Sequence, residues 1–71
     1  MDLRLNVKEI KNAINQLPDG YRVVFNLYTI EGYDHKEIAQ ILEVSEATSK
    51  SQYSRAKKRL RELLRKGTVN R

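Results

Sequence analysis

Apolar residues recur at intervals of three and four in the first part of the chain, which is the spacing of one buried helical face. The members of the first set are Val7, Ile10, Ile14 and Leu17. They predict a helix over about residues 6–16, with Asn6 as its N-cap and Glu9 at the capping-box spacing. This helix should end before Pro18, because the residue preceding a proline is pushed out of the α region.

A second apolar set follows the proline. Its members are Tyr21, Val24, Phe25, Leu27 and Tyr28. They predict a helix over about residues 18–30, in which Pro18 occupies the first turn, where no backbone N–H is needed. Gly32 should end this helix, because glycine adopts the left-handed conformation of a helix C-terminus without steric cost.

A third, shorter helix is predicted over about residues 35–42. Asp34 precedes it as an N-cap, and Glu37 stands at the capping-box position. Its apolar residues are Ile38, Ala39, Ile41 and Leu42. No segment shows the strict alternation of a strand, so the pattern predicts an all-α domain.

The fourth and longest helix is predicted over about residues 46–65. Ser45 is a good N-cap, and Glu46 in the first turn complements the positive end of the helix dipole. Gly67 is expected to end the helix, which leaves residues 67–71 as a tail.

The third and fourth predicted helices, with the short turn between them, match a helix-turn-helix. Ala39 supplies the small residue needed where the second helix crosses the first, and Val44 supplies the apolar residue needed in the turn. The inward face of the long helix consists of Ser49, Tyr53, Ala56, Leu60 and Leu63. The outward face consists of Lys50, Ser51, Ser54, Arg55, Lys58, Arg61, Glu62 and Arg65. The expected fold is a small four-helix domain that contains a helix-turn-helix.

Charge is distributed unevenly along the chain. Residues 1–44 hold five basic and seven acidic residues, a net charge of −2, whereas residues 45–71 hold nine basic and two acidic ones, a net charge of +7. A basic segment on a near-neutral scaffold is typical of a polyanion-binding protein. Small hydroxyl residues keep the basic helix slim where it would enter the major groove, and the later cations would meet phosphates.

Composition excludes several other classes of function. The 71 residues suffice for one domain with a modest core. The absence of cysteine and the single histidine exclude a disulfide framework and the common metal sites, and no cofactor is expected. Without clustered carboxylates beside a base or a glycine-rich phosphate loop, the chain is not expected to be an enzyme. No apolar run is long enough for a membrane span or a secretory signal, so a soluble, intracellular protein is expected.

One protein family combines these features. A Leu-Pro step, the stretch "YRVVFNLYTIEGYDHKEIAQIL" and the helix ending in "SRAKKRLREL" resemble region 4 of bacterial sigma-70-family factors, in particular the extracytoplasmic-function (ECF) type. The resemblance covers residues 13–64. A bare helix-turn-helix is a common pattern, whereas this ordered set is quite specific.

The resemblance implies that the domain recognises the −35 promoter element and directs RNA polymerase to promoters in the bacterial cytoplasm. The base contacts it implies are Lys50, Ser51, Ser54 and Arg55. The phosphate contacts it implies are Tyr33, His35, Lys36, Lys57, Lys58 and Arg59. His35 also fits an ordinary surface residue or a contact through its backbone. The implied partners are the β-subunit flap of RNA polymerase and, in many members, an anti-sigma factor; alone, the chain should be a monomer.

Three departures from the family pattern carry their own expectations. Glu43 stands where the family more often has glycine, so it would be strained if that position needs a positive φ. Ser49 replaces an apolar residue of the inward face and should hydrogen-bond to backbone or face a small pocket. Nothing corresponds to region 2, so we expect an excised domain, a truncated product or a stand-alone relative.

Two alternatives remain open from the sequence. The effector domain of a LuxR-type response regulator shares the four-helix plan, but it usually dimerises through its last helix, which here carries Arg61, Arg65 and Lys66 on its outer face. A protein-interaction module, sequestered by an anti-sigma factor, would use the apolar stripes and the basic helix to bind other proteins. Such a module would show no retention of duplex DNA, whereas a DNA-binding domain would release duplex steeply as salt rises.

Overall fold

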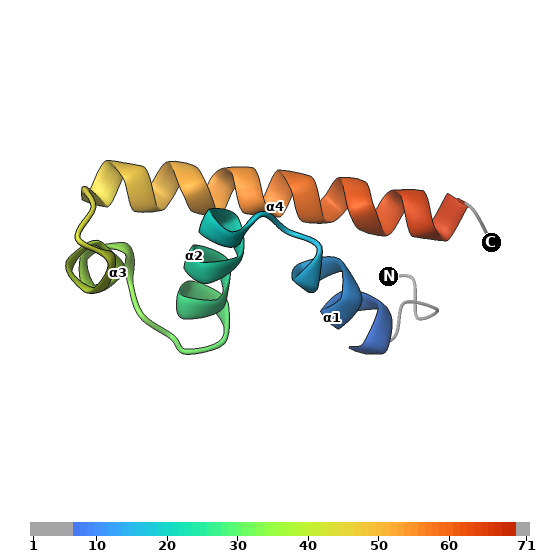
Figure 1. The fold of residues 1–71 in the computed structure, drawn as a ribbon, viewed down its shortest axis with the longest axis horizontal. Coiled ribbons are helices and arrows are strands. Elements are labelled where there is room, and N and C mark those ends of the chain that lie inside the picture. Colours follow the sequence, from blue (N-terminus) through green and yellow to red (C-terminus); the bar gives the residue numbers. More distant parts are fainter. Residues whose placement is uncertain (1–6, 70–71) are drawn as a thin grey trace.

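Three short helices pack along one side of a long fourth helix (Figure 1). The computed structural model describes the backbone of residues 7–69 and the side chains of residues 7–65. The helices are α1 (Val7–Asn15), α2 (Asp19–Thr29), α3 (His35–Leu42) and α4 (Glu46–Val69). Since α4 spans the length of the molecule, the overall shape is elongated, 41 × 19 × 17 Å. The predicted all-α fold with a helix-turn-helix is confirmed.

The core lies between α2, the C-terminal part of α1 and the middle of α4. Leu17, Phe25 and Ala56 are its buried members. Partly buried apolar residues pack around them: Ile14, Tyr21, Tyr53, Leu60 and Leu63. Ala56 is completely buried, and its small side chain lets the backbones of α2 and α4 approach closely.

Helix α1 contributes less of its predicted apolar face to the core than expected. Val7 is 67% exposed and Ile10 is 37% exposed, whereas Ala13, which the pattern did not include, is buried. The Arg22 side chain joins α1 to α2, because its guanidinium donates to the Asn15 carbonyl (3.2 Å) and to the Asp19 carboxylate (2.5 Å). Pro18 is the N-cap of α2 rather than its first helical residue.

The predicted signals between α2 and α3 are all present. Gly32 has φ +84°, the conformation that glycine adopts without steric cost. Asp34 and Glu37 form a capping box: the Asp34 side chain accepts from the Glu37 N–H (2.8 Å), and the Glu37 side chain accepts from the Asp34 N–H (2.9 Å). These two bonds fix the start of α3.

The turn between α3 and α4 contains a strained residue. Glu43 adopts the left-handed conformation (φ 57°, ψ 46°), as the family's usual glycine implied. This geometry lets the Val44 N–H reach the Ala39 carbonyl (3.0 Å). Ser45 then caps α4, since its Oγ accepts from the Thr48 N–H (3.0 Å).

Several expected features differ in the structure. Helix α4 continues through Gly67 to Val69 instead of ending near residue 65, so the predicted tail is helical as far as it is described. Ile41 is 48% exposed and Val44 is 39% exposed, although both were expected to be apolar packing residues. The expected cap at Asn6 and residues 70–71 lie outside the described residues.

Candidate nucleic-acid interface

A hydrogen bond between two side chains joins the two helices of the helix-turn-helix. Ser49 of α4 is fully buried, and its Oγ lies 2.8 Å from Nδ1 of His35 at the start of α3. The His35 ring stacks on Tyr28 of α2, with centroids 4.5 Å apart and an angle of 19° between the planes. Tyr53 of α4 closes the group, with its centroid 4.5 Å from that of Tyr28 and 5.6 Å from that of His35. We call these four residues the α3–α4 junction.

The junction explains one departure from the family pattern and changes the interpretation of His35. The Ser49 hydroxyl is satisfied by a side chain fourteen positions earlier, not by the small pocket or extra backbone bond that we expected. The His35 ring is half-buried, with Nδ1 bonded to Ser49 and one face stacked on Tyr28, so the ring is held by the junction rather than standing free on the surface. Tyr53 belongs to the packed interior, as its inward position predicted.

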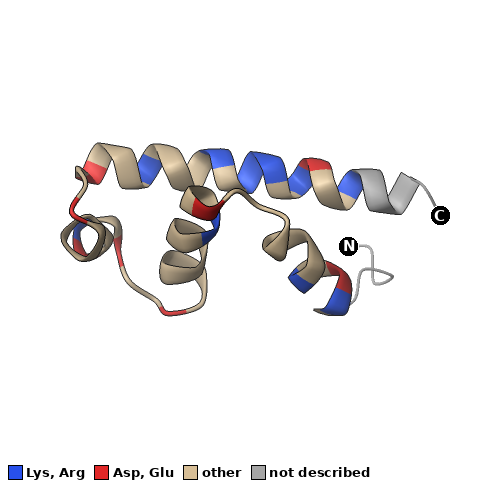
Figure 2. Cartoon of the chain, viewed as in Figure 1, with Lys and Arg blue, Asp and Glu red and all other residues tan. Residues whose placement is uncertain are grey.

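The outward side of α4 presents the other predicted base contacts unequally. Lys50, Ser54 and Arg55 are exposed over the first three turns of the helix. Ser51 is partly buried, and its hydroxyl donates to the Thr48 carbonyl (3.2 Å). Blue segments, which mark Lys and Arg, follow one another along the ribbon of this helix, and the other three helices lie on one side of it (Figure 2).

Two carboxylates on α4 pair with cations of the same helix. Glu46 Oε2 lies 3.5 Å from Lys50 Nζ, and Glu62 Oε1 lies 3.4 Å from the Arg59 guanidinium. All four side chains are at least half exposed, so these pairs contribute little to stability and exchange readily with other partners. From the sequence, Glu46 was expected only to complement the helix dipole, although its spacing of four from Lys50 is also that of an ion pair on one helix face.

The predicted phosphate contacts on α4 are exposed but point to different sides. The Lys57 ammonium lies over the Tyr53 ring, 4.8 Å from its centroid, next to the α3–α4 junction. Lys58 and Arg59 line a hollow of about 280 Å³ on the other flank, together with Tyr21, Arg55 and Glu62. The arrangement therefore puts cations on both flanks of the outward face of α4.

The two remaining predicted phosphate contacts are beside the start of α3. Tyr33 and Lys36 are exposed, and the Tyr33 backbone is held by the bond from its N–H to the Leu27 carbonyl (3.0 Å). Helix α3 packs against the first turns of α4 at one end of the molecule (Figure 1). The structure therefore gathers Tyr33, Lys36 and Lys50 at the same end.

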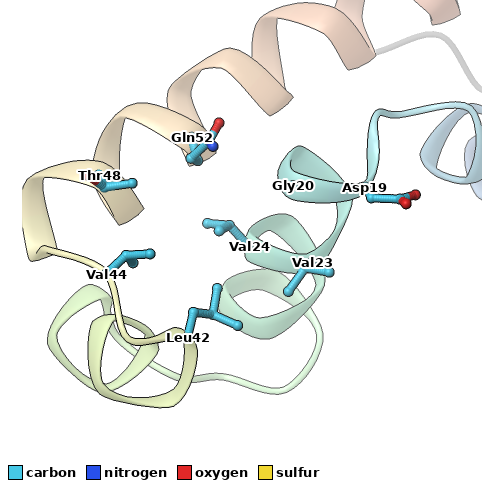
Figure 3. A pocket seen from close by; sticks show the side chains of 8 residues that line it. All are labelled: Asp19, Gly20, Val23, Val24, Leu42, Val44, Thr48 and Gln52. Atoms are coloured by element: carbon cyan, nitrogen blue, oxygen red, sulfur yellow. The ribbon is translucent and has the colours of Figure 1, made fainter.

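An apolar cleft opens between α2, the α3–α4 turn and the first half of α4 (Figure 3). Its volume is about 320 Å³, and most of its wall is formed by Val23, Val24, Leu42 and Val44. Gln52 lies at its edge, where the side-chain oxygen is buried and accepts no hydrogen bond among the described residues. Val44 thus lines an open cleft instead of filling the angle between the helices.

Over the described part of the chain, no helix is long and apolar enough to cross a membrane. Nor do three or more His, Asp or Glu side chains of that part come together in a way that could hold a metal ion.

Comparison with known proteins agrees with the resemblance seen in the sequence. The family model described as "Sigma-70, region 4" matches residues 8–60. The ECF RNA polymerase sigma factor SigM of Bacillus subtilis (strain 168) is 35% identical over 65 residues, which cover 90% of this chain and 40% of SigM. The chain therefore spans about two fifths of the length of this curated relative. These findings favour neither the response-regulator alternative nor the pure protein-interaction module.

Proposed function

Because this chain belongs to the sigma-70 region 4 family, we propose that it recognises the −35 element of bacterial promoters as the C-terminal domain of an ECF-type sigma factor. In this role it directs RNA polymerase to those promoters in the bacterial cytoplasm. The proposal assigns no catalytic step and no cofactor to the chain.

The observation that carries the proposal is the exposed, cationic N-terminal part of α4. The recognition helix of a helix-turn-helix enters the major groove with its N-terminal residues against base edges. Lys50 and Arg55 are the long, exposed donors there, and such side chains bind the O6 and N7 atoms of guanine. Ser54 is small and exposed, so it leaves room for the groove wall, while the partly buried Ser51 is the weakest of the four base contacts.

Phosphate contacts on both sides of the groove would hold the helix in register. Tyr33, Lys36 and the His35 backbone lie beside one strand, where the first helix of such a motif crosses the DNA. The cations of α4 that remain, Lys57, Lys58 and Arg59, would meet phosphates as the helix leaves the groove. Arg59 would exchange its exposed Glu62 partner for a phosphate.

The same proposal includes protein partners. The apolar cleft of Figure 3 is lined mainly by valine and leucine side chains, so it suits an apolar segment of the RNA polymerase β-subunit flap. An anti-sigma factor would compete by covering the basic face of α4. Without these partners the chain is a monomer, because the cations on its longest helix repel a second copy.

The test is a selection of binding sites from randomised duplexes, followed by three substitutions. Lys50→Ala and Arg55→Ala should each remove the preference at one position, a loss of about 1–3 kcal/mol for the cognate base pair. Lys58→Ala is the matched control: it should weaken all sequences equally and make the log–log salt slope less steep by about 0.9. The proposal is wrong if no motif is enriched, or if the three variants behave alike.

A further inference from the structure

Glu46 is an acidic residue at the place where the recognition helix would meet base edges. It is the first residue of α4, its side chain is half exposed, and its Oε2 lies 3.5 Å from the Lys50 ammonium. The pair therefore presents one donor and one acceptor side by side, one helical turn apart. Glu46 is the acidic residue in the first turn of α4, and Figure 2 shows red ribbon at the N-terminal tip of that helix, ahead of the blue segments that mark Lys and Arg.

A carboxylate at a DNA surface is repelled by the phosphates unless a hydrogen-bond donor meets it. In the major groove guanine presents only acceptors and thymine presents an acceptor and a methyl group, whereas cytosine presents its N4 amino group as a donor. Glutamate accepts from that amino group, and adenine N6 is the only other donor there. An acidic residue at this position thus disfavours guanine and thymine and accepts cytosine or adenine.

We propose that Glu46 is a specificity-determining residue that accepts a hydrogen bond from the N4 amino group of a cytosine close to the base pair contacted by Lys50. This inference rests on the proposed function, since it requires α4 to lie in the major groove. One helical turn advances about 5.4 Å, and one base pair about 3.4 Å. The cytosine therefore lies one or two base pairs from the Lys50 contact.

The structural role of Glu46 alone is separable from base recognition. As a first-turn carboxylate, Glu46 also favours the helix dipole, and as a negative charge it lowers affinity for every duplex. Neither effect depends on the base sequence of the DNA. Glu62 provides the matched control, because it is an equally exposed carboxylate on the same helix, paired at 3.4 Å with Arg59, about 24 Å farther along.

The experiment selects sites from randomised duplexes with the wild-type chain and three variants, Glu46→Ala, Glu46→Gln and Glu62→Gln. With Glu46→Ala, the preference for cytosine at one position should fall by about tenfold while the other positions keep their preferences. With Glu46→Gln, that position should change to adenine, whose N6 and N7 atoms a glutamine side chain binds together. Glu62→Gln should keep the wild-type motif and bind all duplexes somewhat more tightly.

Thermal unfolding followed by circular dichroism accompanies the selection, since lost capping lowers stability without changing any base preference. If Glu46→Ala and Glu62→Gln both reproduce the wild-type motif, Glu46 does not contact a base, and the proposed function stands. If the wild-type chain itself selects no motif, the proposed function fails, and this inference fails with it.

Discussion

The two halves of α4 are held against the other helices by different chemistry. From its middle onward, α4 packs the apolar side chains of Ala56, Leu60 and Leu63 against the core of α1 and α2. The N-terminal half is joined to α3 by the hydrogen bond between Ser49 and His35, with tyrosine rings around it. Apolar burial is non-directional, whereas a hydrogen bond fixes an orientation. The apolar half should therefore provide stability, and the junction should set how the DNA-facing turns of α4 sit on α3.

Substitution in the apolar core, against which α4 packs, should produce the largest loss of stability. Leu17→Ala removes a side chain that is only 2% exposed, so it should lower the free energy of unfolding by about 2–5 kcal/mol. Urea denaturation measures this change. Ile30→Ala is the matched control, because Ile30 is 64% exposed and should change stability by no more than about 0.5 kcal/mol. Equal effects of the two variants would contradict the assignment of the core.

The α3–α4 junction should show coupling between its two polar residues. His35→Ala should cost about 1–3 kcal/mol, because it leaves the buried Ser49 hydroxyl without its partner and removes the ring stacked on Tyr28. Ser49→Ala should cost less, since the half-buried His35 ring can still reach water. A double-mutant cycle by urea denaturation should give a coupling of about 0.5–1.5 kcal/mol. Additive single effects would show that the bond contributes nothing.

Replacing Glu43 by glycine in the turn between α3 and α4 should increase the stability of the protein. Glu43→Gly relieves a left-handed residue, which costs about 1–2 kcal/mol, and part of that gain is offset by the greater freedom of glycine in the unfolded chain. The net stabilisation should be up to about 1 kcal/mol in thermal or urea unfolding. Glu31→Gly, at an exposed position without a positive φ, should instead destabilise. A loss of stability on Glu43→Gly would mean that the glutamate makes a compensating contact.

The smallest change in stability is expected at Lys57, four residues after Tyr53 of the α3–α4 junction. Lys57→Met removes the cation over the Tyr53 ring and should lower stability by about 0.5–1 kcal/mol. Lys58→Met is the control, because Lys58 lies over no ring in the described part of the chain and should leave stability unchanged. Both variants should make the salt slope of duplex binding less steep by about 0.9 if each lysine contacts a phosphate. A variant that leaves the slope unchanged identifies a lysine that does not touch DNA.

Local signals in the sequence were sufficient for much of the fold. The capping box at Asp34, the positive φ of Gly32 and the strain at Glu43 each depend on residues within a few positions, so they were predicted correctly. The site was only partly predictable. Exposure of Lys50 and Arg55 follows from helical periodicity, but the hydrogen bond that holds the His35 ring depends on a residue fourteen positions away. No spacing rule connects the two, because they meet only when α3 packs on α4.

The sequence by itself determined four helices, a short turn between the last two, and a basic outward face on the longest of them. These properties follow from periodicity, capping and charge, which act over one or two helical turns. Only the tertiary structure decided that Ser49 is satisfied by His35, that Val44 lines an open cleft, and that Ser51 is less accessible than Ser54. Those outcomes depend on the crossing of helices that are distant in sequence, and a pattern along one helix carries no information about the side chains that another helix brings to it.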